Sequence, residues 1–135
     1  MKILNVEAVV DNIYKVTDFV DEQLDEAECP LKTKLQLELA IEELFVNIAN
    51  YAYDSETGMA EIGFEIENDP KTAVFVLSDS GKPYNPLMKE DPDVTLPRRE
   101  RPIGGLGIFV VKKGMDDMFY EYKDGKNVLT LKKIL

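Results

Sequence analysis

Three short motifs follow one another in this sequence, and each falls at a different kind of predicted element. Glu43-x-x-x-Asn47 lies inside a long helical pattern, Asp79-Ser80-Gly81 ends an apolar strand, and Gly104-Gly105-Leu106-Gly107 precedes another helical pattern. Together they place a carboxylate and an amide on one helix, a carboxylate beside a flexible glycine, and a glycine-rich loop at the start of a second helix. Such a chain needs both helices and strands around one site.

Hydrophobic spacing predicts the other elements. We expect a strand over 2–6, a helix over 11–27, a longer helix from Pro30-Leu31 to about Tyr53, a hairpin of strands 63–67 and 72–77, a third helix from near Gly105, and a closing hairpin of strands 118–122 and 128–131 around Asp124-Gly125. The predicted fold class is α+β, a two-layer α/β sandwich in which helices cover one face of a mixed, mostly antiparallel sheet.

Size and charge limit the classes of protein. The 135 residues fit a single domain, 1–135, and the formal net charge of -10 opposes binding to nucleic acid or to an anionic membrane. The sequence has no apolar run long enough for a signal peptide or a membrane span, so we expect a cytoplasmic protein. Histidine is absent and Cys29 is the only cysteine, which excludes imidazole chemistry, an intrachain disulfide and a cysteine-rich zinc framework.

The long second helix has two polar faces beside its apolar one. Helical projection predicts a core face of Leu37, Ile41, Leu44, Phe45, Ile48 and Ala52. Glu38 and Glu42 form one polar group, which we interpret as solvent-facing. Gln36, Glu43, Asn47 and Asn50 form the other, a stripe beside the core, because residues four or seven apart lie nearly above one another.

This stripe is suited to a magnesium nucleotide. One amide oxygen, from Asn47, together with phosphate oxygens would suffice for magnesium, which keeps several waters. Glu43, one turn earlier, would be placed to take a proton from an attacking hydroxyl or water. The alternative is that both residues are ordinary exposed or hydrogen-bonded helix residues.

The other two motifs provide a base end and a phosphate end. The Asp79 carboxylate accepts hydrogen bonds only, so it suits the amino group of adenine, and Gly81 would let the backbone approach the base. Gly104, Gly105 and Gly107 offer unhindered amides at a helix start, where phosphate binds well, and the basic run Arg98-Arg99-Glu100-Arg101 precedes them. The long connection over 80–103 is typical of a lid. A plain turn and a solvated loop are the alternatives.

The motifs resemble those of the GHKL ATPase and kinase superfamily. Residues 43–47 are similar to its N box, Asp79-Ser80-Gly81-Lys82-Pro83-Tyr84-Asn85-Pro86 to its first glycine box, and Gly104-Gly105-Leu106-Gly107-Ile108-Phe109 to its second. The Asp-x-Gly-x-x-Tyr-Asn-Pro form and the ending 122–131 resemble the small stand-alone anti-sigma factor serine kinases. The resemblance implies the GHKL, or Bergerat, fold, with ATP between helices and a mobile lid.

The resemblance also implies roles for individual residues. Glu43 would be the catalytic base, Asn47 would bind Mg²⁺, Asp79 with Gly81 would hold adenine, and Thr130 would help to hold it. The predicted nucleotide site further includes Asn50 of the helix stripe and Gly104, Gly105, Leu106 and Gly107 at the phosphates. Where many such kinases have a histidine soon after the N-box asparagine, this chain has Asn50-Tyr51.

Two functions follow from these expectations. The first is an ATP- and magnesium-dependent kinase that phosphorylates a serine of a small antagonist protein and sequesters a sigma factor, usually as a homodimer. The second is a nucleotide-gated binding module of the same fold with little or no phosphotransfer. The catalytic half of a sensor histidine kinase is disfavoured, because the chain has no phosphoacceptor histidine.

Overall fold

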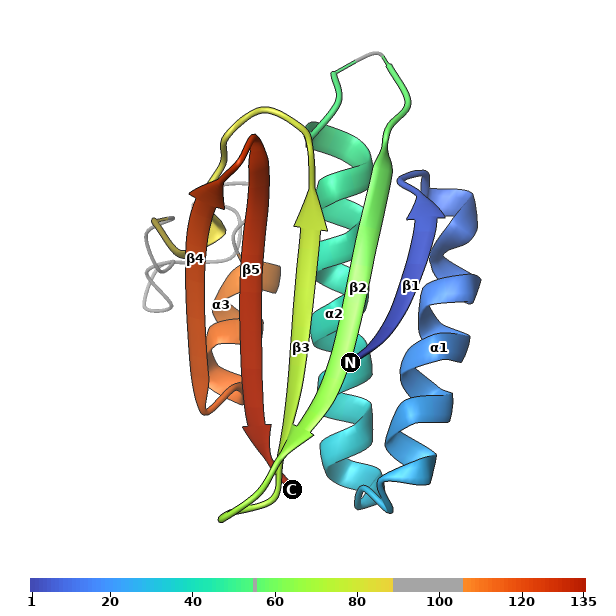
Figure 1. Cartoon of the computed structure of the whole chain (residues 1–135), viewed down its shortest axis with the longest axis vertical. Helices are drawn as coiled ribbons and strands as arrows, with labels where there is room; N and C mark the ends of the chain where they lie inside the picture. The colour runs from blue at the N-terminus through green and yellow to red at the C-terminus, as the bar shows by residue number, and fades with distance from the viewer. Residues whose placement is uncertain (55, 89–105) are drawn as a thin grey trace, which may run out of the picture.

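The computed structural model describes residues 1–54, 56–88 and 106–135. Its elements are β1 (Lys2–Glu7), η1 (Val10–Asn12), α1 (Ile13–Glu26), α2 (Leu31–Tyr51), β2 (Met59–Glu67), β3 (Thr72–Asp79), η2 (Pro86–Met88), α3 (Leu106–Gly114), β4 (Asp117–Lys123) and β5 (Lys126–Ile134) (Figure 1). Each predicted helix and strand is confirmed, although β2 begins at Met59 rather than Gly63. Most of the predicted lid, the basic run and Gly104-Gly105 lie outside the described residues.

The strands form one sheet in the order β1-β2-β3-β5-β4. Every pairing in it is antiparallel, so the expectation of a mixed sheet is wrong for the described part of the chain. Tight turns explain this for β2–β3 and β4–β5, since a short connection reverses the chain. Between β4 and β5, Asp124 and Gly125 both have positive φ, as the predicted two-residue hairpin turn requires.

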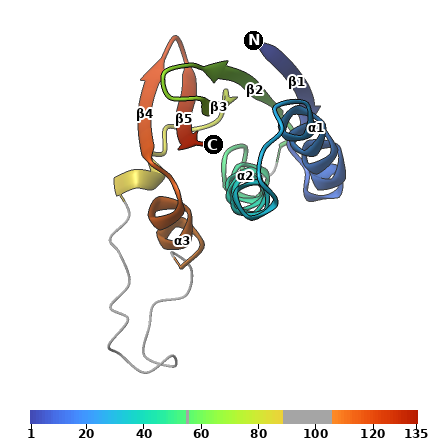
Figure 2. The same ribbon diagram turned by 90° about the horizontal axis from the view of Figure 1, so that it is seen from below.

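The three long helices pack on one face of the sheet, as Figure 2 shows from below. Their apolar sides meet the inward side chains of the strands, including the fully buried Val16 and Val20 of α1, Leu37, Ile41 and Phe45 of α2, and Ile62, Phe75 and Leu131 of the sheet. The predicted two-layer α+β sandwich is therefore confirmed. None of the helices in the described ranges is both long and apolar enough to cross a bilayer.

The two polar groups on α2 have different surroundings from those predicted. Glu38 and Glu42 are half-buried against α1, where the Thr17 hydroxyl donates to Glu42 Oε1 at 3.1 Å. Burial, reinforced by a hydrogen bond with Asp21, raises the pKa of Glu38. The interpretation of these glutamates as plainly solvent-facing is wrong, because a helical projection locates polar residues but does not say which helix lies beside them.

Tyr53 fastens the end of α2 to the two central strands. Its hydroxyl donates to the Met59 carbonyl at 2.6 Å and accepts from the Ser80 amide at 2.8 Å. Burial raises the pKa of this phenol, so it remains a donor at neutral pH. The turn after α2 is thus held to the start of β2 and to the residue that follows β3.

We expect Tyr53→Phe to lower the free energy of unfolding by about 1–3 kcal/mol, because two backbone groups lose their partner. Urea unfolding followed by circular dichroism would measure the change. Tyr14→Phe is the matched control, since Tyr14 is an exposed residue of α1. Equal stabilities of the two variants would contradict a fastening role for the Tyr53 hydroxyl.

Candidate functional site

A cavity lies where β3 ends and β5 begins, beside the last turns of α2. Figure 1 shows where these parts of the three elements lie. Much of its wall is apolar and comes from Leu44, Ile48, Leu77, Pro86 and Leu129. The polar side chains in the wall include Asn47, Asp79 and Asn127. An apolar cavity with a few convergent polar groups is the usual form of a small-molecule site.

Asp79 is the buried carboxylate of this cavity, only 7% exposed at the end of β3. Its Oδ1 accepts hydrogen bonds from the Gly81 amide at 2.9 Å and from Asn127 Nδ2 at 3.0 Å. A buried carboxylate is costly unless such donors stabilise it. Asp79 therefore lies at the end of its strand, as predicted, and in the wall of this cavity, and two donors fix its position.

Asn127 is the partner that sequence reasoning missed. Besides the bond to Asp79, its Nδ2 donates to the Lys82 carbonyl at 2.9 Å, and its Oδ1 accepts from the Tyr84 amide at 3.0 Å and from the Tyr120 hydroxyl. Burial raises the pKa of Tyr120, which keeps that hydroxyl protonated. The Asn127 oxygen meets only donors and its nitrogen only acceptors, so these hydrogen bonds fix the orientation of the side-chain amide.

Thr130, which was predicted beside the adenine, lies on the other face of the sheet. Side chains alternate along a strand, and Leu129 and Leu131 of β5 point to the cavity and the core. Thr130 lies between them and therefore points away, so its predicted contact with the base is wrong. The alternation Asn127-x-Leu129-x-Leu131 could have identified Asn127, because the polar residue shares the face of two apolar ones.

Gly81 has a structural reason to be glycine. A Cβ at this position would lie 2.3 Å from the Ala52 carbonyl oxygen and 2.6 Å from the Ala52 Cβ. The next amide, of Lys82, donates to the same carbonyl at 3.0 Å. In this structure the backbone at Gly81 therefore approaches the end of α2, whereas its predicted approach to a base stays a prediction.

The polar stripe of α2 is divided between two places. Asn47 lines the cavity, whereas Asn50 is exposed and outside its wall, where Tyr51 takes part instead. Glu43 faces α3: a Cβ on Gly107 would lie 2.0 Å from Glu43 Oε1. Glu43 and Gly107 both line a groove between α2 and α3. Two of the predicted motifs therefore meet at this contact.

The described part of the cavity is small. Its volume is about 60 Å³, which is less than a whole purine nucleotide requires. Lys82 and Tyr84 line it and are exposed, so they are the side chains best able to move aside. Among the predicted phosphate-binding residues, Gly104 and Gly105 lie outside the described residues, and only the backbone of Leu106 is described.

This geometry suits a flat heterocycle with a polar amino group. Apolar side chains can cover the ring faces, and the anchored Asp79 carboxylate can accept from the amino group. Asn47 adds an amide toward the α2 side of the cavity, one helical turn from Glu43. The described residues contain no cluster of three or more histidine, cysteine, aspartate or glutamate side chains arranged for a metal. A cation here would thus need ligand oxygens as well as Asn47.

Comparisons with known proteins agree with this geometry. Residues 6–133 match the family described as "Histidine kinase-like ATPase domain". The chain is 29% identical over 102 residues to proteins named "Serine-protein kinase RsbW" from Bacillus cereus (strain AH187) and Bacillus mycoides (strain KBAB4). It is 30% identical over 104 residues to the protein of that name from Oceanobacillus iheyensis.

These alignments cover only part of each protein. They include 73% of this chain, 62% of the two Bacillus relatives and 64% of the Oceanobacillus relative. The motifs at residues 43–47 and 79–81, with Gly107, all lie within the range of the family match.

We expect Asn127→Ala to lower the free energy of unfolding by about 1–3 kcal/mol, because the buried Asp79 carboxylate loses a donor. Urea unfolding of the variant would measure this. Thr130→Ala is the control on the same strand and should leave the stability within about 0.5 kcal/mol of the native value. A larger loss in Thr130→Ala than in Asn127→Ala would contradict the placement of these two residues.

Proposed function

Because the chain belongs to the histidine kinase-like ATPase domain family, we propose that it binds ATP with Mg²⁺ and acts as a regulatory serine kinase. One observation supports this most directly: the buried Asp79 carboxylate, fixed by Gly81 and Asn127, at the edge of an apolar cavity.

Adenine would enter with its amino group toward Asp79. Both described hydrogen bonds to this carboxylate go to Oδ1, so Oδ2 is the oxygen for the amino group. A guanine at that edge presents a carbonyl instead and would face a carboxylate that cannot donate. Leu44, Ile48, Leu77 and Leu129 would cover the ring. The base end thus favours adenine over guanine through one anchored acceptor.

The phosphates would extend toward the stretch that begins α3. Asn47, on the cavity wall, would offer one side-chain oxygen to magnesium, whose remaining ligands would be phosphate oxygens and water. When bound, magnesium ATP supplies the phosphoryl group and neutralises part of its charge. The backbone amides at the start of α3, near Gly107, would bind the phosphates, because the start of a helix favours negative charge.

Glu43 would accept the proton of the attacking serine hydroxyl. It lies on α2, one turn before Asn47, and it faces Gly107 in the first turn of α3. A carboxylate within reach of a hydroxyl in this position can act as a general base. Glu43 lies outside the wall of the adenine cavity. The second candidate function therefore stays open: a module that changes its affinity for a protein partner when ATP binds and transfers no phosphate.

The protein partners are inferred from kinship. The relatives bear the name serine-protein kinase, and the motifs resemble those of anti-sigma factor kinases. We therefore propose a small antagonist protein with a phosphorylatable serine as the substrate, and a sigma factor as the sequestered partner. By the same kinship, we propose that the protein is a homodimer.

Calorimetric titration with ATP tests the site. We expect magnesium-dependent binding to the native protein and an affinity roughly 10–100-fold lower in Asn47→Ala, which loses one ligand to a charged group. Asn50→Ala is the matched control, because Asn50 is exposed on the same helix and outside the cavity wall. Its affinity should equal that of the native protein. Failure of the native protein to bind ATP would refute both candidate functions.

Glu43→Gln separates the kinase from the module. We expect ATP binding to persist while transfer of label from γ-labelled ATP to serine of a partner protein falls by roughly 10²–10⁴-fold. Phosphoamino acid analysis after incubation with an extract of the source organism gives the measurement. Glu42→Gln, which faces α1, should transfer at the native rate. Undiminished transfer by Glu43→Gln would contradict the base role, and no transfer by the native protein would favour the module.

A further inference from the structure

Strand β1 covers only part of the edge of β2. Its first residue, Lys2, pairs with Phe64, and β2 continues beyond this pair to Glu67. Figure 1 shows this step: β1 starts partway along β2, and in the described part of the chain the last part of β2 has no strand on that side. The end of β2 is therefore an open edge of the sheet, and an open edge can accept a further strand.

The hydrogen-bond pattern shows which backbone groups face this edge. The Ala8 amide donates to the Gly58 carbonyl at 2.8 Å, and these residues are opposite each other in the register of β1 and β2. In antiparallel strands every second pair of opposite residues is hydrogen-bonded, so the even-numbered residues of β2 point their backbone groups toward β1. Ile66 is one of them, but no residue of β1 lies opposite it. Within the described residues, its N–H and C=O therefore lack a strand partner.

The other side of β2 gives the same result independently. The Leu135 amide donates to the Lys71 carbonyl at 3.0 Å, and these two residues are opposite each other in the register of β3 and β5. The odd-numbered residues of β3 thus bond to β5, and its even-numbered residues bond to β2. Val74 is therefore hydrogen-bonded to Glu65, its register partner on β2. The backbone groups of Ile66 point the opposite way, toward the open edge.

A groove lies beside this edge, between the end of β2 and the last turns of α1. Its volume is about 570 Å³, and Gln23, Ala27, Phe64 and Ile66 are part of its wall. The two sides of the groove are joined, because Lys71 Nζ, from the turn between β2 and β3, donates to the Ala27 carbonyl at 2.6 Å. The distance between α1 and the free backbone groups of Ile66 is thereby restrained.

Gln23 is a buried polar residue in the wall of this groove. It is only 6% exposed, yet its side-chain amide makes no hydrogen bond within the described residues. Every fully enclosed side-chain nitrogen or oxygen in the described part of the chain has a partner, so both amide atoms of Gln23 reach open space. The groove is the open space that Gln23 lines. A ligand with one donor and one acceptor would satisfy this amide.

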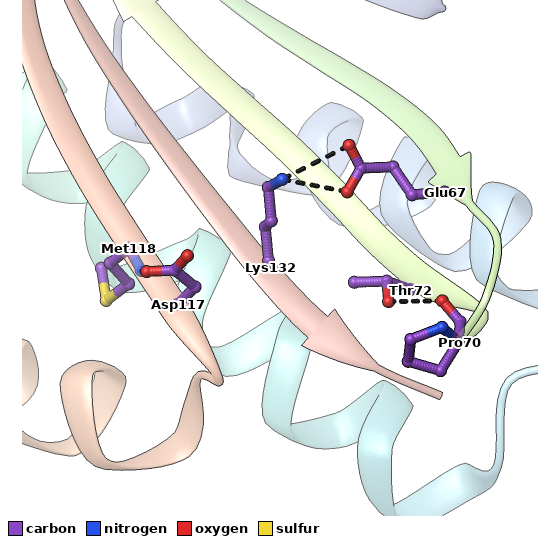
Figure 3. A network of polar contacts seen from close by, with 6 residues as sticks. All are labelled: Glu67, Pro70, Thr72, Asp117, Met118 and Lys132. Atoms are coloured by element: carbon purple, nitrogen blue, oxygen red, sulfur yellow. Dashed lines mark hydrogen bonds and ion pairs between the residues drawn. The ribbon is translucent and has the colours of Figure 1, made fainter.

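The end of β2 is held in place from the opposite face of the sheet, as Figure 3 shows. Lys132 Nζ lies 2.9 Å from Oε1 and 3.3 Å from Oε2 of Glu67. At the adjoining turn, the Thr72 hydroxyl donates to the Pro70 carbonyl at 2.8 Å. The open edge is thus ordered before any partner binds, which lowers the entropic cost of adding a strand.

We propose that an extended segment of a partner protein binds to this edge as an added strand, with an asparagine or glutamine opposite Ile66. Its backbone would donate to the Ile66 carbonyl and accept from the Ile66 N–H, as in other strand additions. Opposite residues place their side chains on the same face of a sheet, so the amide side chain would enter the groove beside Gln23. Met1 lines the groove but lies outside β1 and is 60% exposed, so it would move aside.

The chemistry of Gln23 favours an amide over a charged side chain in the groove. Two amides can exchange one N–H···O bond in each direction, which satisfies both. A carboxylate cannot donate and an ammonium cannot accept, so either would leave one atom of Gln23 without a partner. The ionisable side chains of the wall, Lys2, Glu26 and Glu65, are of both signs and select for neither charge.

Amide hydrogen exchange of the full chain, followed by NMR without nucleotide, tests the open edge itself. We expect the Ile66 amide to exchange roughly 10-fold or more faster than the Glu65 amide, its matched control on the same strand, which is bonded to β3. Equal protection of the two amides would overturn the open edge. Protection of Ile66 that rises with protein concentration would assign the edge to a second copy of the chain and would also overturn the proposal.

Titration with a blocked peptide tests the occupant. The probe is acetyl-Thr-Thr-Gln-Thr-Thr-amide, in which the threonines favour an extended chain. We expect saturable NMR shifts of the Ile66 amide and the Gln23 side-chain amide, and a dissociation constant roughly 10-fold lower than for the same peptide with leucine in place of glutamine. No saturable shift up to roughly 10 mM peptide, or equal affinities of the two peptides, would overturn the proposal.

A variant of Gln23 tests the amide pair. Gln23→Leu keeps the size of the side chain but removes its donor and acceptor, so the affinity for the glutamine peptide should fall roughly 10-fold. Gln36→Leu, on α2 and outside this groove, is the matched control and should bind as the native chain does. Circular dichroism would confirm that both variants are folded. If Gln23→Leu does not fold, the comparison of the two peptides on the native chain still decides.

A single blocked residue separates strand addition from binding of an amide alone. Acetyl-glutamine-amide carries the side chain without an extended backbone, so we expect it to bind roughly 10-fold or more weakly than the pentapeptide. Equal affinity would overturn the added strand. Neither Gln23 nor Ile66 lines the ATP cavity, so failure of peptide binding and failure of ATP binding would be distinguishable.

Discussion

The hydrogen bond between Asp79 and Asn127 is the constraint on which the site depends. It joins the last residue of β3 to the second residue of β5, which are register partners in the sheet. Asn127 also binds the backbone at Lys82 and Tyr84, so the turn after β3 has one fixed position. A buried carboxylate without these donors would be costly. The geometry of the cavity is thus determined by the pairing of two strands.

Helix α2 carries the other half of the site, and it packs between α1 and α3 on the sheet (Figure 2). Leu37, Ile41 and Phe45 fix its rotation against the sheet, and this rotation directs Asn47 to the cavity and Glu43 to α3. At its end, the Ala52 carbonyl receives the turn that contains Gly81. Core packing and function therefore use the same helix, on adjacent faces, and a change in the rotation of α2 would displace both polar residues together.

The sequence could predict what depends on local periodicity, and it could not predict what depends on register or on neighbours. Spacing located the helices, the Asp124-Gly125 turn and Asp79 at a strand end. Thr130 was misplaced because a role taken from kinship ignored the alternation on β5, which sends it to the face opposite Asn127. Glu42 was misread because its partner, Thr17, lies 25 positions earlier on another helix.

The two faces of β5 carry different sets of side chains. Asn127 and Leu129 face the cavity, whereas Thr130 and Lys132 lie on the opposite face of the sheet. A slip of β5 by one residue would exchange these sets and would destroy both surfaces at once. Any force that shifts β5 against β3 therefore acts on the Asp79 anchor and on the cavity wall together.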